Sequence, residues 1–331
     1  MNYFLLLFLI LILVIIGVYL KSKRHTIESF SNKTPFPIDI VYTWAGEDIS
    51  DNIRLSNNNE LKYSLRSVYK YAPWVNHIYI LMNPPKRKPS WFNNDYNRLI
   101  TIVDQRETFP KGCVLPNTNS NAIETTLHNI KGLSEHFIYF NDDFFLGKHV
   151  DYTDFFTKEG KPKIQSRVKQ FDDLSQYKAG TLPIKYPKMI EYSKLYFYDH
   201  IPIPFLKSYI VKFHKEYPDY INWIRTYRSR NGIGCDVCSK YNLGCPCQSI
   251  QYTIAKYMYD DNMVELDNIY HHYFNGDNIN ELESFRDRPC KFFCINDTET
   301  NMSKRQNVQN RMNVFFKSFY REIPFFEKLS K

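Results

Sequence analysis

Residues 38–143 alternate between apolar segments of strand character and segments of helical periodicity, and this alternation constrains the fold more than any other feature. The strand-like segments are rich in β-branched and aromatic residues and end at Gly, Pro, Asn or Asp. They are residues 38–44, 77–82, 99–103 and 136–140. The helical segments are residues 58–71 and 121–130. This order predicts an α/β fold with a Rossmann-like, mainly parallel sheet, whose functional residues gather at the carboxyl ends of the strands.

The second half of the chain loses this alternation and is predicted to be mainly helical. The expected helices are residues 204–215, 218–227, 249–259 and 308–320. No internal repeat and no Pro/Gly/Ser-rich linker divides this part of the sequence. We therefore expect residues 38–331 to form one domain.

An uncharged, apolar run from Tyr3 to Leu20 precedes this domain. As a helix rising about 1.5 Å per residue it would be about 27 Å long, enough to span the core of a bilayer. A cleaved signal peptide is the competing interpretation. It would need a basic start and a small-residue cleavage site, and neither Met1-Asn2 nor Val18-Tyr19-Leu20 provides one. The run predicts a single-pass transmembrane anchor.

The charges beside this run predict its orientation. Basic residues follow it at once, whereas only the α-amino group precedes it; they are Lys21, Lys23, Arg24 and His25. The positive-inside rule then favours a cytoplasmic catalytic body, with the Golgi or ER lumen as the alternative. Residues 21–37 are interpreted as a basic and polar linker.

The basic balance of the chain does not by itself identify a partner. A net charge of +8 and a pI of about 8.9 fit anionic substrates, nucleic acid or a membrane surface equally well. Acidic residues are interspersed among the basic ones, and no basic helix or aromatic stacking motif stands out. A nucleic-acid partner is therefore not expected.

The fourth strand-like segment runs directly into the acidic pair Asp142-Asp143. Enzymes that use nucleotide sugars can hold the donor diphosphate through a divalent cation bound by such oxygen ligands. The alternative is a pair that only caps the loop at the end of the strand. The first interpretation predicts a Mg²⁺ or Mn²⁺ site at Asp142 and Asp143.

Four stretches of the sequence together resemble the Stealth family, which includes bacterial capsule hexose-1-phosphate transferases and the catalytic subunit of the animal N-acetylglucosamine-1-phosphotransferase. They are IDIVYTWAGED at 38–48, ELKYSLRSVYKYAPWV at 60–75, LPNTNSNAIETTLHNIKGLSEHFIYFNDDFFLG at 115–147 and RPCKFFCIND at 288–297. The resemblance extends over blocks at 38–48, 58–150, 186–260 and 280–325. It implies transfer of a hexose or N-acetylhexosamine 1-phosphate from a nucleotide sugar, such as a UDP-sugar, to a hydroxyl of a glycan or glycoprotein, with release of UMP.

The resemblance assigns the donor nucleotide to the end of the first strand. It implies that Tyr42, Thr43 and Trp44 belong to the nucleotide pocket, where an aromatic ring can stack on uracil. Core packing is the alternative for Trp44. Asp48 matches the acidic residue that closes this motif, although the family has two residues between Trp and Gly where this chain has only Ala45.

Further donor-binding residues are implied on two helical segments. Arg66 could clamp a phosphate with two hydrogen bonds; a buried pair with Glu60 or another carboxylate is the alternative. Asn119, Ser120 and Glu124 lie at the start of a helix, where the N-terminus favours anions. Simple N-capping by Asn119 or Ser120 is the alternative there.

The resemblance also implies further catalytic groups. His200, which lies just before a proline in the third block, is the expected general base for the acceptor hydroxyl, because an imidazole titrates near neutral pH. Arg228 is expected to face the donor phosphate, with Arg230 as a local alternative. Asn296 and Asp297 close the fourth block and would add oxygen ligands suited to Mg²⁺ or Mn²⁺.

Four of the seven cysteines are packed into a short insert; they are Cys235, Cys238, Cys245 and Cys247. Their spacing predicts a structural Zn²⁺ site in a reducing compartment. A disulfide cluster in a lumen is the alternative.

Two other functions stay open at the level of sequence. A metal-dependent glycosyltransferase would use the same acidic pair and release UDP. A catalytically inactive membrane scaffold would keep the fold alone, but the retained acidic pair, His200 and Arg228 argue against it.

Overall fold

The structure is a computed structural model, and it describes part of the chain: residues 10–17, 34–47, 57–93, 99–166, 200–226, 263–265, 271–297, 299 and 301–328. Several sequence predictions lie outside the described residues. These are Asp48, Arg228, the cysteine cluster at 235–247, the helix predicted at 249–259 and most of the anchor predicted at 3–20.

The main sheet has five strands in the order β3-β2-β1-β4-β7. The first four run parallel, and the fifth pairs antiparallel with β4 at the edge of the sheet. The strands are β1 (Ile38–Trp44), β2 (His77–Met82), β3 (Ile100–Asp104), β4 (His136–Asn141) and β7 (Ile203–Leu206). The mainly parallel α/β sheet that the alternation predicts is therefore confirmed.

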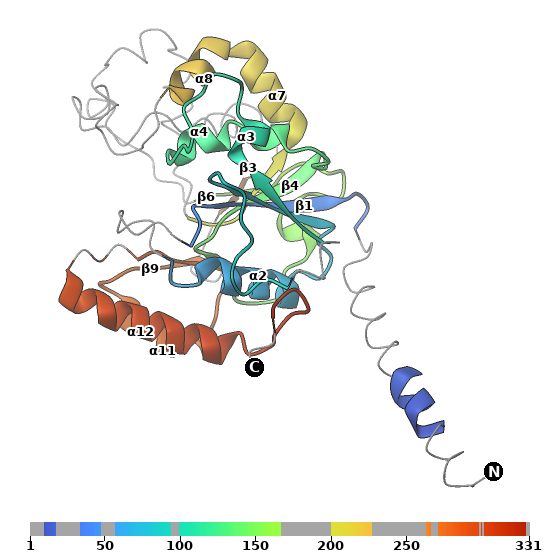
Figure 1. Ribbon diagram of the computed structural model, residues 1–331, viewed down its shortest axis with the longest axis vertical. Coiled ribbons are helices and arrows are strands. Elements are labelled where there is room, and N and C mark those ends of the chain that lie inside the picture. The colour runs from blue at the N-terminus through green and yellow to red at the C-terminus, as the bar shows by residue number, and fades with distance from the viewer. Residues whose placement is uncertain are drawn as a thin grey trace.

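Helices cover both faces of this sheet (Figure 1). On one face lie α2 (Glu60–Tyr71) and α12 (Met302–Phe319). On the other lie short helices and two longer ones; they are α3 (Gln105–Thr108), α4 (Ser120–Glu124), α7 (Lys207–Glu216) and α8 (Pro218–Arg225). Successive side chains of β1 alternate between the two cores, so that Ile40 and Tyr42 pack with the α2 layer and Val41 packs on the opposite side.

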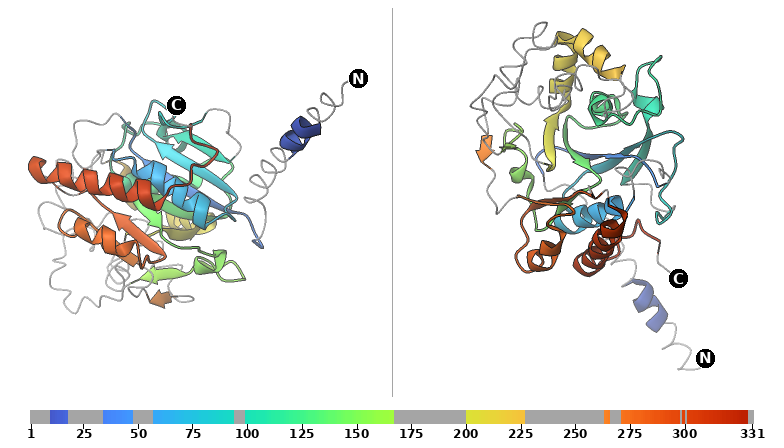
Figure 2. Two further views of the ribbon diagram at one scale, coloured as in Figure 1. Left: turned by 90° about the horizontal axis from the view of Figure 1, so that it is seen from below. Right: turned by 90° about the vertical axis from the view of Figure 1, so that its left-hand side faces the viewer.

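α12 comes from the C-terminal end of the chain and lies alongside α2 (Figure 2). The rings of Tyr63 and Phe316 stack between the two helices with centroids 4.8 Å apart. This contact brings α12 next to the first turns of α2. The start of α2 lies at the carboxyl ends of the parallel strands.

A second, smaller sheet extends directly from the acidic pair. Its order is β5-β10-β9, formed by β5 (Phe144–Leu146), β10 (Phe292–Ile295) and β9 (His271–Phe274). Because β9 and β10 lie in the second half of the chain, the prediction that this half is mainly helical is wrong for these two segments. The strands of this sheet are three or four residues long and largely aromatic, so they carry no alternation that would separate them from loop or helix.

The remaining elements are short. They are η3 (Tyr152–Asp154), the paired strands β6 (Ile164–Ser166) and β8 (Met263–Glu265), η5 (Ile279–Glu281) and α11 (Leu282–Phe285).

Three predicted helix boundaries differ from the structure for local reasons. The segment predicted as a helix from residue 204 begins as β7, where Pro204 is tolerated because the strand lies at an edge. The helix predicted at 121–130 is split into α4 and η2 (Leu127–Asn129). The hydroxyls of Thr125 and Thr126 donate to carbonyls three residues earlier and compete with helix continuation. α12 begins at Met302, six residues before the prediction, because Asn301 caps it.

Residues 10–17 are helical and their side chains are exposed. Among the helices that the structure describes, none combines the length and the apolar character needed to cross a bilayer.

Candidate active site

A cavity of about 180 Å³ opens at the carboxyl ends of the central strands. Its walls come from the ends of β1, β2, β4 and β10, from the start of α2 and from residues 117–123. The register of the sheet explains this convergence, because Thr43 of β1 is paired with both Leu81 of β2 and Asn141 of β4. The described residues that line the cavity include four carboxylates and no Lys or Arg side chain; the carboxylates are Glu60, Asp142, Asp143 and Asp297.

Hydrogen bonds fix the floor of the cavity where β1 and β4 end. The hydroxyl of Tyr139 donates to Asn141 Oδ1 at 2.7 Å, and the Thr43 hydroxyl lies 3.3 Å from the same oxygen. Tyr139 also lies 3.2 Å from a carboxylate oxygen of Glu124. The side chain of Asn141, just before Asp142 and Asp143, is therefore held by hydroxyl groups of β1 and β4.

Glu60 forms a wall of the cavity from the first turn of α2. Its carboxylate accepts hydrogen bonds from the Asn58 backbone N–H at 2.5 Å and from Asn58 Nδ2 at 2.7 Å. Burial raises the pKa of Glu60 to about 7, and the charge of Asp143 adds to the rise. Asn58 Nδ2 also lies 3.1 Å from Asp297 Oδ2, which joins the start of α2 to the end of β10.

The acidic pair lines the same cavity, and burial shifts its pKa values in the same direction. Burial raises the pKa of Asp142 well above its usual range, and the charges of Asp143 and Glu60 raise it further. Burial also raises the pKa of Asp143, although the nearby His200 and a hydrogen bond from Cys294 lower it. A cluster of carboxyl groups with raised pKa values is a site that gains from a bound cation.

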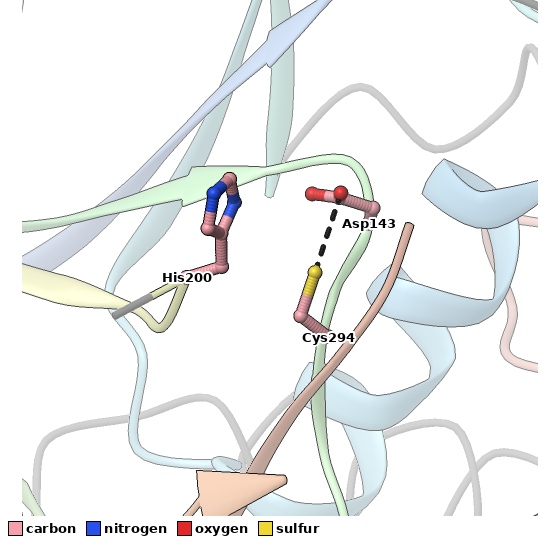
Figure 3. Close-up of side chains that lie close together, drawn as sticks. All are labelled: Asp143, His200 and Cys294. Carbon is pink, nitrogen blue, oxygen red and sulfur yellow. Dashed lines mark hydrogen bonds between the residues drawn. The ribbon is translucent and has the colours of Figure 1, made fainter. Parts of the chain in front are cut away.

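Asp143, His200 and Cys294 face one another beside the cavity (Figure 3). Each offers one ligand atom, and these atoms all lie within 4.8 Å of one another. The Cys294 thiol lies 3.3 Å from Asp143 Oδ2. The His200 ring is exposed and lies near the rings of Phe144 and Tyr273, with centroids 6.1 and 5.6 Å away. The structure thus brings His200 next to the acidic pair, from a separate part of the chain.

One oxygen of Asp143 indicates that the residues fit the predicted divalent cation. Asp143 Oδ1 is buried and has no hydrogen-bond partner among the described residues. A buried carboxylate oxygen without a donor is costly unless a cation reaches it. Asp142, Asp143 and the amide of Asn296 line the cavity and offer the hard oxygen ligands that Mg²⁺ and Mn²⁺ prefer.

Asp297, the fourth predicted oxygen ligand, lines the cavity but already has a cationic partner. Its Oδ2 lies 3.3 Å from Arg305 Nη2 of α12, and both side chains are buried. This pair neutralises one of the four carboxylates and holds the end of β10 against α12.

The residues predicted to bind the donor divide into two groups. Thr43, Trp44 and Ser120 line the cavity. Asn119 is buried and caps α4 by accepting from the Asn121 N–H, which matches the alternative given for it above. Glu124 does not line the cavity; its carboxylate lies within hydrogen-bond distance of the Tyr139 hydroxyl.

The structure corrects the predictions for Tyr42 and Arg66. Tyr42 is fully buried on the α2 side of β1, where its hydroxyl lies 2.8 Å from Ser64 Oγ, so a nucleotide has no access to it. Strand alternation explains why Thr43 reaches the cavity and its neighbour does not. The Arg66 guanidinium is buried and binds both oxygens of Glu327, at 2.5 and 2.7 Å, which is the buried pair named above as the alternative.

Glu60 and Cys294 belong to the site but were not predicted from the sequence. Glu60 occupies the first turn of a helix, where an acidic residue is usually explained by the helix dipole. Cys294 lies inside an apolar strand, where a cysteine is usually a small core residue. The sequence signal for each is its position within the stretches 60–75 and 288–297, which resemble the Stealth family.

Comparison with known proteins places the chain in a family. Residues 54–164 match the family model described as Stealth protein CR2, conserved region 2. A capsular polysaccharide phosphotransferase of Haemophilus influenzae is 31% identical over 336 residues, which cover 89% of this chain and 88% of that protein. The chain belongs to the Stealth family. An exopolysaccharide phosphotransferase of Streptomyces coelicolor is 43% identical to this Stealth protein over 143 residues, or 38% of this chain and 24% of that protein.

Among solved structures, the galactosyltransferase LgtC matches this Stealth protein at 12% sequence identity and a TM-score of 0.45, covering 83% of this chain and 95% of that one.

Proposed function

We propose that this Stealth protein transfers a hexose or N-acetylhexosamine 1-phosphate from a UDP-sugar to a hydroxyl group of a glycan and releases UMP. One observation carries the proposal: Asp142 and Asp143 line the cavity, and Asp143, whose buried Oδ1 has no hydrogen-bond partner among the described residues, has a carboxylate oxygen within 4.8 Å of a ring nitrogen of His200. The relatives described above are named as capsular and exopolysaccharide phosphotransferases, which supports the same class of reaction.

The proposed chemistry is a direct displacement at the sugar-bearing phosphorus. His200 accepts the proton of the acceptor hydroxyl, and the hydroxyl oxygen forms a bond to the β-phosphorus of the donor. The bond from that phosphorus to the bridging oxygen breaks, and UMP leaves with the bonding electrons. Exposure of His200 beside the cavity supports this role, because the acceptor must reach it from solvent.

Asp142 and Asp143 would hold a Mg²⁺ or Mn²⁺ ion, with Asn296 as a further oxygen ligand. When bound, such an ion supplies positive charge to offset the donor diphosphate. Thr43, Trp44 and Ser120 line the cavity and would contact the donor. Asp48 and Arg228 complete the proposed donor site from parts of the chain outside the described residues.

The released nucleotide tests the proposal. The full chain in detergent is incubated with UDP-sugars, a glycan acceptor and Mg²⁺ or Mn²⁺, and the nucleotide product is identified by mass spectrometry. UMP is the expected product. UDP would identify a metal-dependent glycosyltransferase, and neither product with any donor would favour an inactive scaffold; both outcomes would overturn the proposal.

We further propose that residues 3–20 anchor the protein in a membrane with the catalytic body in the cytoplasm, and that the cysteines at 235–247 bind one structural Zn²⁺. The charge step after Leu20 and the cysteine spacing support this arrangement. All seven cysteines should then be alkylated after chelation and unfolding without reductant. Glycans on Asn32, which lies in an N-glycosylation sequon, would instead show a luminal body.

A further inference from the structure

We propose that Asp143, His200 and Cys294 together form a binding site for Zn²⁺, and that zinc bound there competes with the Mg²⁺- or Mn²⁺-dependent reaction. The inhibition rests on the function proposed above; the binding site does not. The carboxylate, imidazole and thiol converge in Figure 3, with their ligand atoms within 4.8 Å of one another.

The chemical types of these side chains distinguish zinc from the cation of the proposed reaction. Zn²⁺ in proteins is held by Cys sulfur, His nitrogen and carboxylate oxygen, commonly with three protein ligands and one open position. Mg²⁺ requires oxygen ligands, and a thiolate offers it little. A site made of one oxygen, one nitrogen and one sulfur therefore selects a softer ion than the oxygen ligands Asp142, Asp143 and Asn296 do.

The backbone holds two of the three ligands in place. Cys294 of β10 is the antiparallel partner of Phe144, the residue directly after Asp143. The N–H of Ile295 donates to the backbone carbonyl of Asp143 at 3.1 Å, which ties the two strands on either side of the ligand pair. Cys294 and Asp143 thus lie next to each other because of sheet register, although 151 positions separate them in the sequence.

The third ligand makes the site accessible to an ion, and one oxygen of Asp143 is available to bind it. His200 is exposed, so the approach from solvent passes its ring. Asp143 Oδ1 is buried and has no hydrogen-bond partner among the described residues, which leaves an acceptor that a cation could take. On binding, Cys294 would lose its proton to solvent and give up its contact with Asp143 Oδ2.

Zinc at this site would block the proposed reaction in two ways. It would occupy Asp143, which the reaction needs for its own cation, and it would take the imidazole nitrogen of His200, which could then no longer accept the proton of the acceptor hydroxyl. Zinc should therefore inhibit in competition with Mg²⁺ or Mn²⁺.

Direct binding is tested with the full chain against a chromophoric zinc chelator. Because the 235–247 cysteines are proposed to bind zinc as well, the informative quantity is the difference between variants. Cys294→Ser should bind about one zinc ion fewer than the wild type. Cys113→Ser is the control and should bind as many as the wild type, because Cys113 belongs neither to the 235–247 cysteines nor to the proposed site. Equal zinc content in Cys294→Ser and the wild type would overturn the site.

A second variant covers the case in which Cys294→Ser fails to fold. His200 is exposed, so His200→Ala should fold and should also lose about one zinc ion per chain. The spectrum of the Co²⁺-loaded protein gives an independent readout, because loss of the Cys294 thiolate lowers its sulfur-to-cobalt absorption. An unchanged zinc content in His200→Ala would contradict the proposed ligand set.

Inhibition is measured as the Mg²⁺-supported rate against added zinc, each variant relative to its own zinc-free rate. The half-inhibiting zinc concentration should rise at least tenfold in Cys294→Ser and stay unchanged in Cys113→Ser. Turnover supported by zinc in place of Mg²⁺ would overturn the competition. Zinc binding that depends on Cys294 in a protein without any UMP-forming activity would confirm the site and refute the function proposed above.

Discussion

Asp143 combines the structural features that indicate a cation site. It follows the end of β4, lies beside His200 and Cys294, and presents a buried oxygen without a partner among the described residues. Such an arrangement costs folding free energy, because a buried carboxylate oxygen without a cation or donor is poorly solvated. Retaining it is understandable if the free energy is recovered when a cation binds.

Asp143→Asn should lower the rate of metal-dependent turnover by about 10²-fold or more, since metal coordination contributes several kcal/mol to such reactions. The melting temperature should not fall, because the substitution removes a buried charge and leaves the core unchanged. Rates at saturating Mg²⁺ and thermal melts check both parts. Asp277→Asn, an exposed aspartate, is the matched control and should behave as the wild type. A normal rate in Asp143→Asn would contradict the metal assignment.

His200→Ala should lower kcat by about 10² to 10⁴, the usual contribution of a general base. Donor affinity should change little, because His200 is not among the described residues that line the cavity. Single-turnover rates and equilibrium donor binding separate the two effects. A loss of donor affinity with unchanged single-turnover chemistry would make His200 a donor ligand instead.

At the scale of elements, α2 links the functional end of the sheet to the C-terminal segment. Its first turn supplies Glu60 to the cavity, and its middle is held by Arg66, which binds Glu327 and also donates to the backbone carbonyl of Tyr320 at 2.7 Å. Lys62 of the same helix lies 3.3 Å from Glu327. The position of Glu60 therefore depends on residues near the end of the chain.

Arg66→Ala should destabilise the fold by about 3 kcal/mol, the low end for breaking a buried ion pair, because Lys62 still partly compensates Glu327. Donor affinity of the folded fraction should be unchanged, since Arg66 does not reach the cavity. Urea unfolding and donor titration measure the two quantities. Arg311→Ala breaks a more exposed pair with Glu283 and should cost about 1 kcal/mol or less. Loss of donor affinity with unchanged stability would show that Arg66 binds the donor.

A pair of histidines packs η2 against α7 on the other face of the sheet. The rings of His128 and His214 are nearly perpendicular with centroids 4.5 Å apart. Burial lowers the pKa of His128 to about 4 and that of His214 to about 3. The charges of Arg225 and Lys207 lower the former further, and His128 and Arg225 lower the latter. Both pKa values lie below the unfolded value of about 6.5, so the folded state favours neutral rings.

This pair should make the protein less stable as the pH falls. Its contribution is fully present above about pH 6.5 and is lost progressively toward the folded pKa values, because the unfolded chain takes up protons that the folded pair refuses. Urea unfolding at steps between pH 7.5 and 5 should show this decline. The double variant His128→Phe/His214→Phe should flatten it, whereas His149→Gln, an exposed control, should not. An identical decline in the double variant would assign it to other groups.

At the scale of the whole molecule, the sequence predicts what is local and misses what depends on distant pairing. The parallel strands β1, β2 and β4 are predicted almost to the residue, because each is a buried apolar run closed by a turn residue. The small sheet is missed because β5 pairs with β10, a partner far along the chain.

The same limit applies to the candidate site. Thr43 and Asp142-Asp143 can be predicted from strand ends alone, since parallel strands bring their carboxyl ends to one edge. The partner of Arg66 lies 261 residues away, and the contact of Cys294 with Asp143 depends on register between two strands. No local pattern encodes either contact. The sequence therefore offers a buried pair for Arg66 only as an alternative and does not identify Glu327 as its partner, and it does not predict the cluster around Cys294.

The bond of the donor that breaks distinguishes the proposed phosphotransferase reaction from glycosyl transfer. A UDP-sugar labelled with ³²P at the β-phosphorus, the phosphorus that carries the sugar, is incubated with the full chain, Mg²⁺ and a glycan acceptor. We expect the label to appear in the acceptor and the released nucleotide to be unlabelled UMP. Label that stays in a released UDP, with an unlabelled sugar on the acceptor, would contradict the proposed reaction.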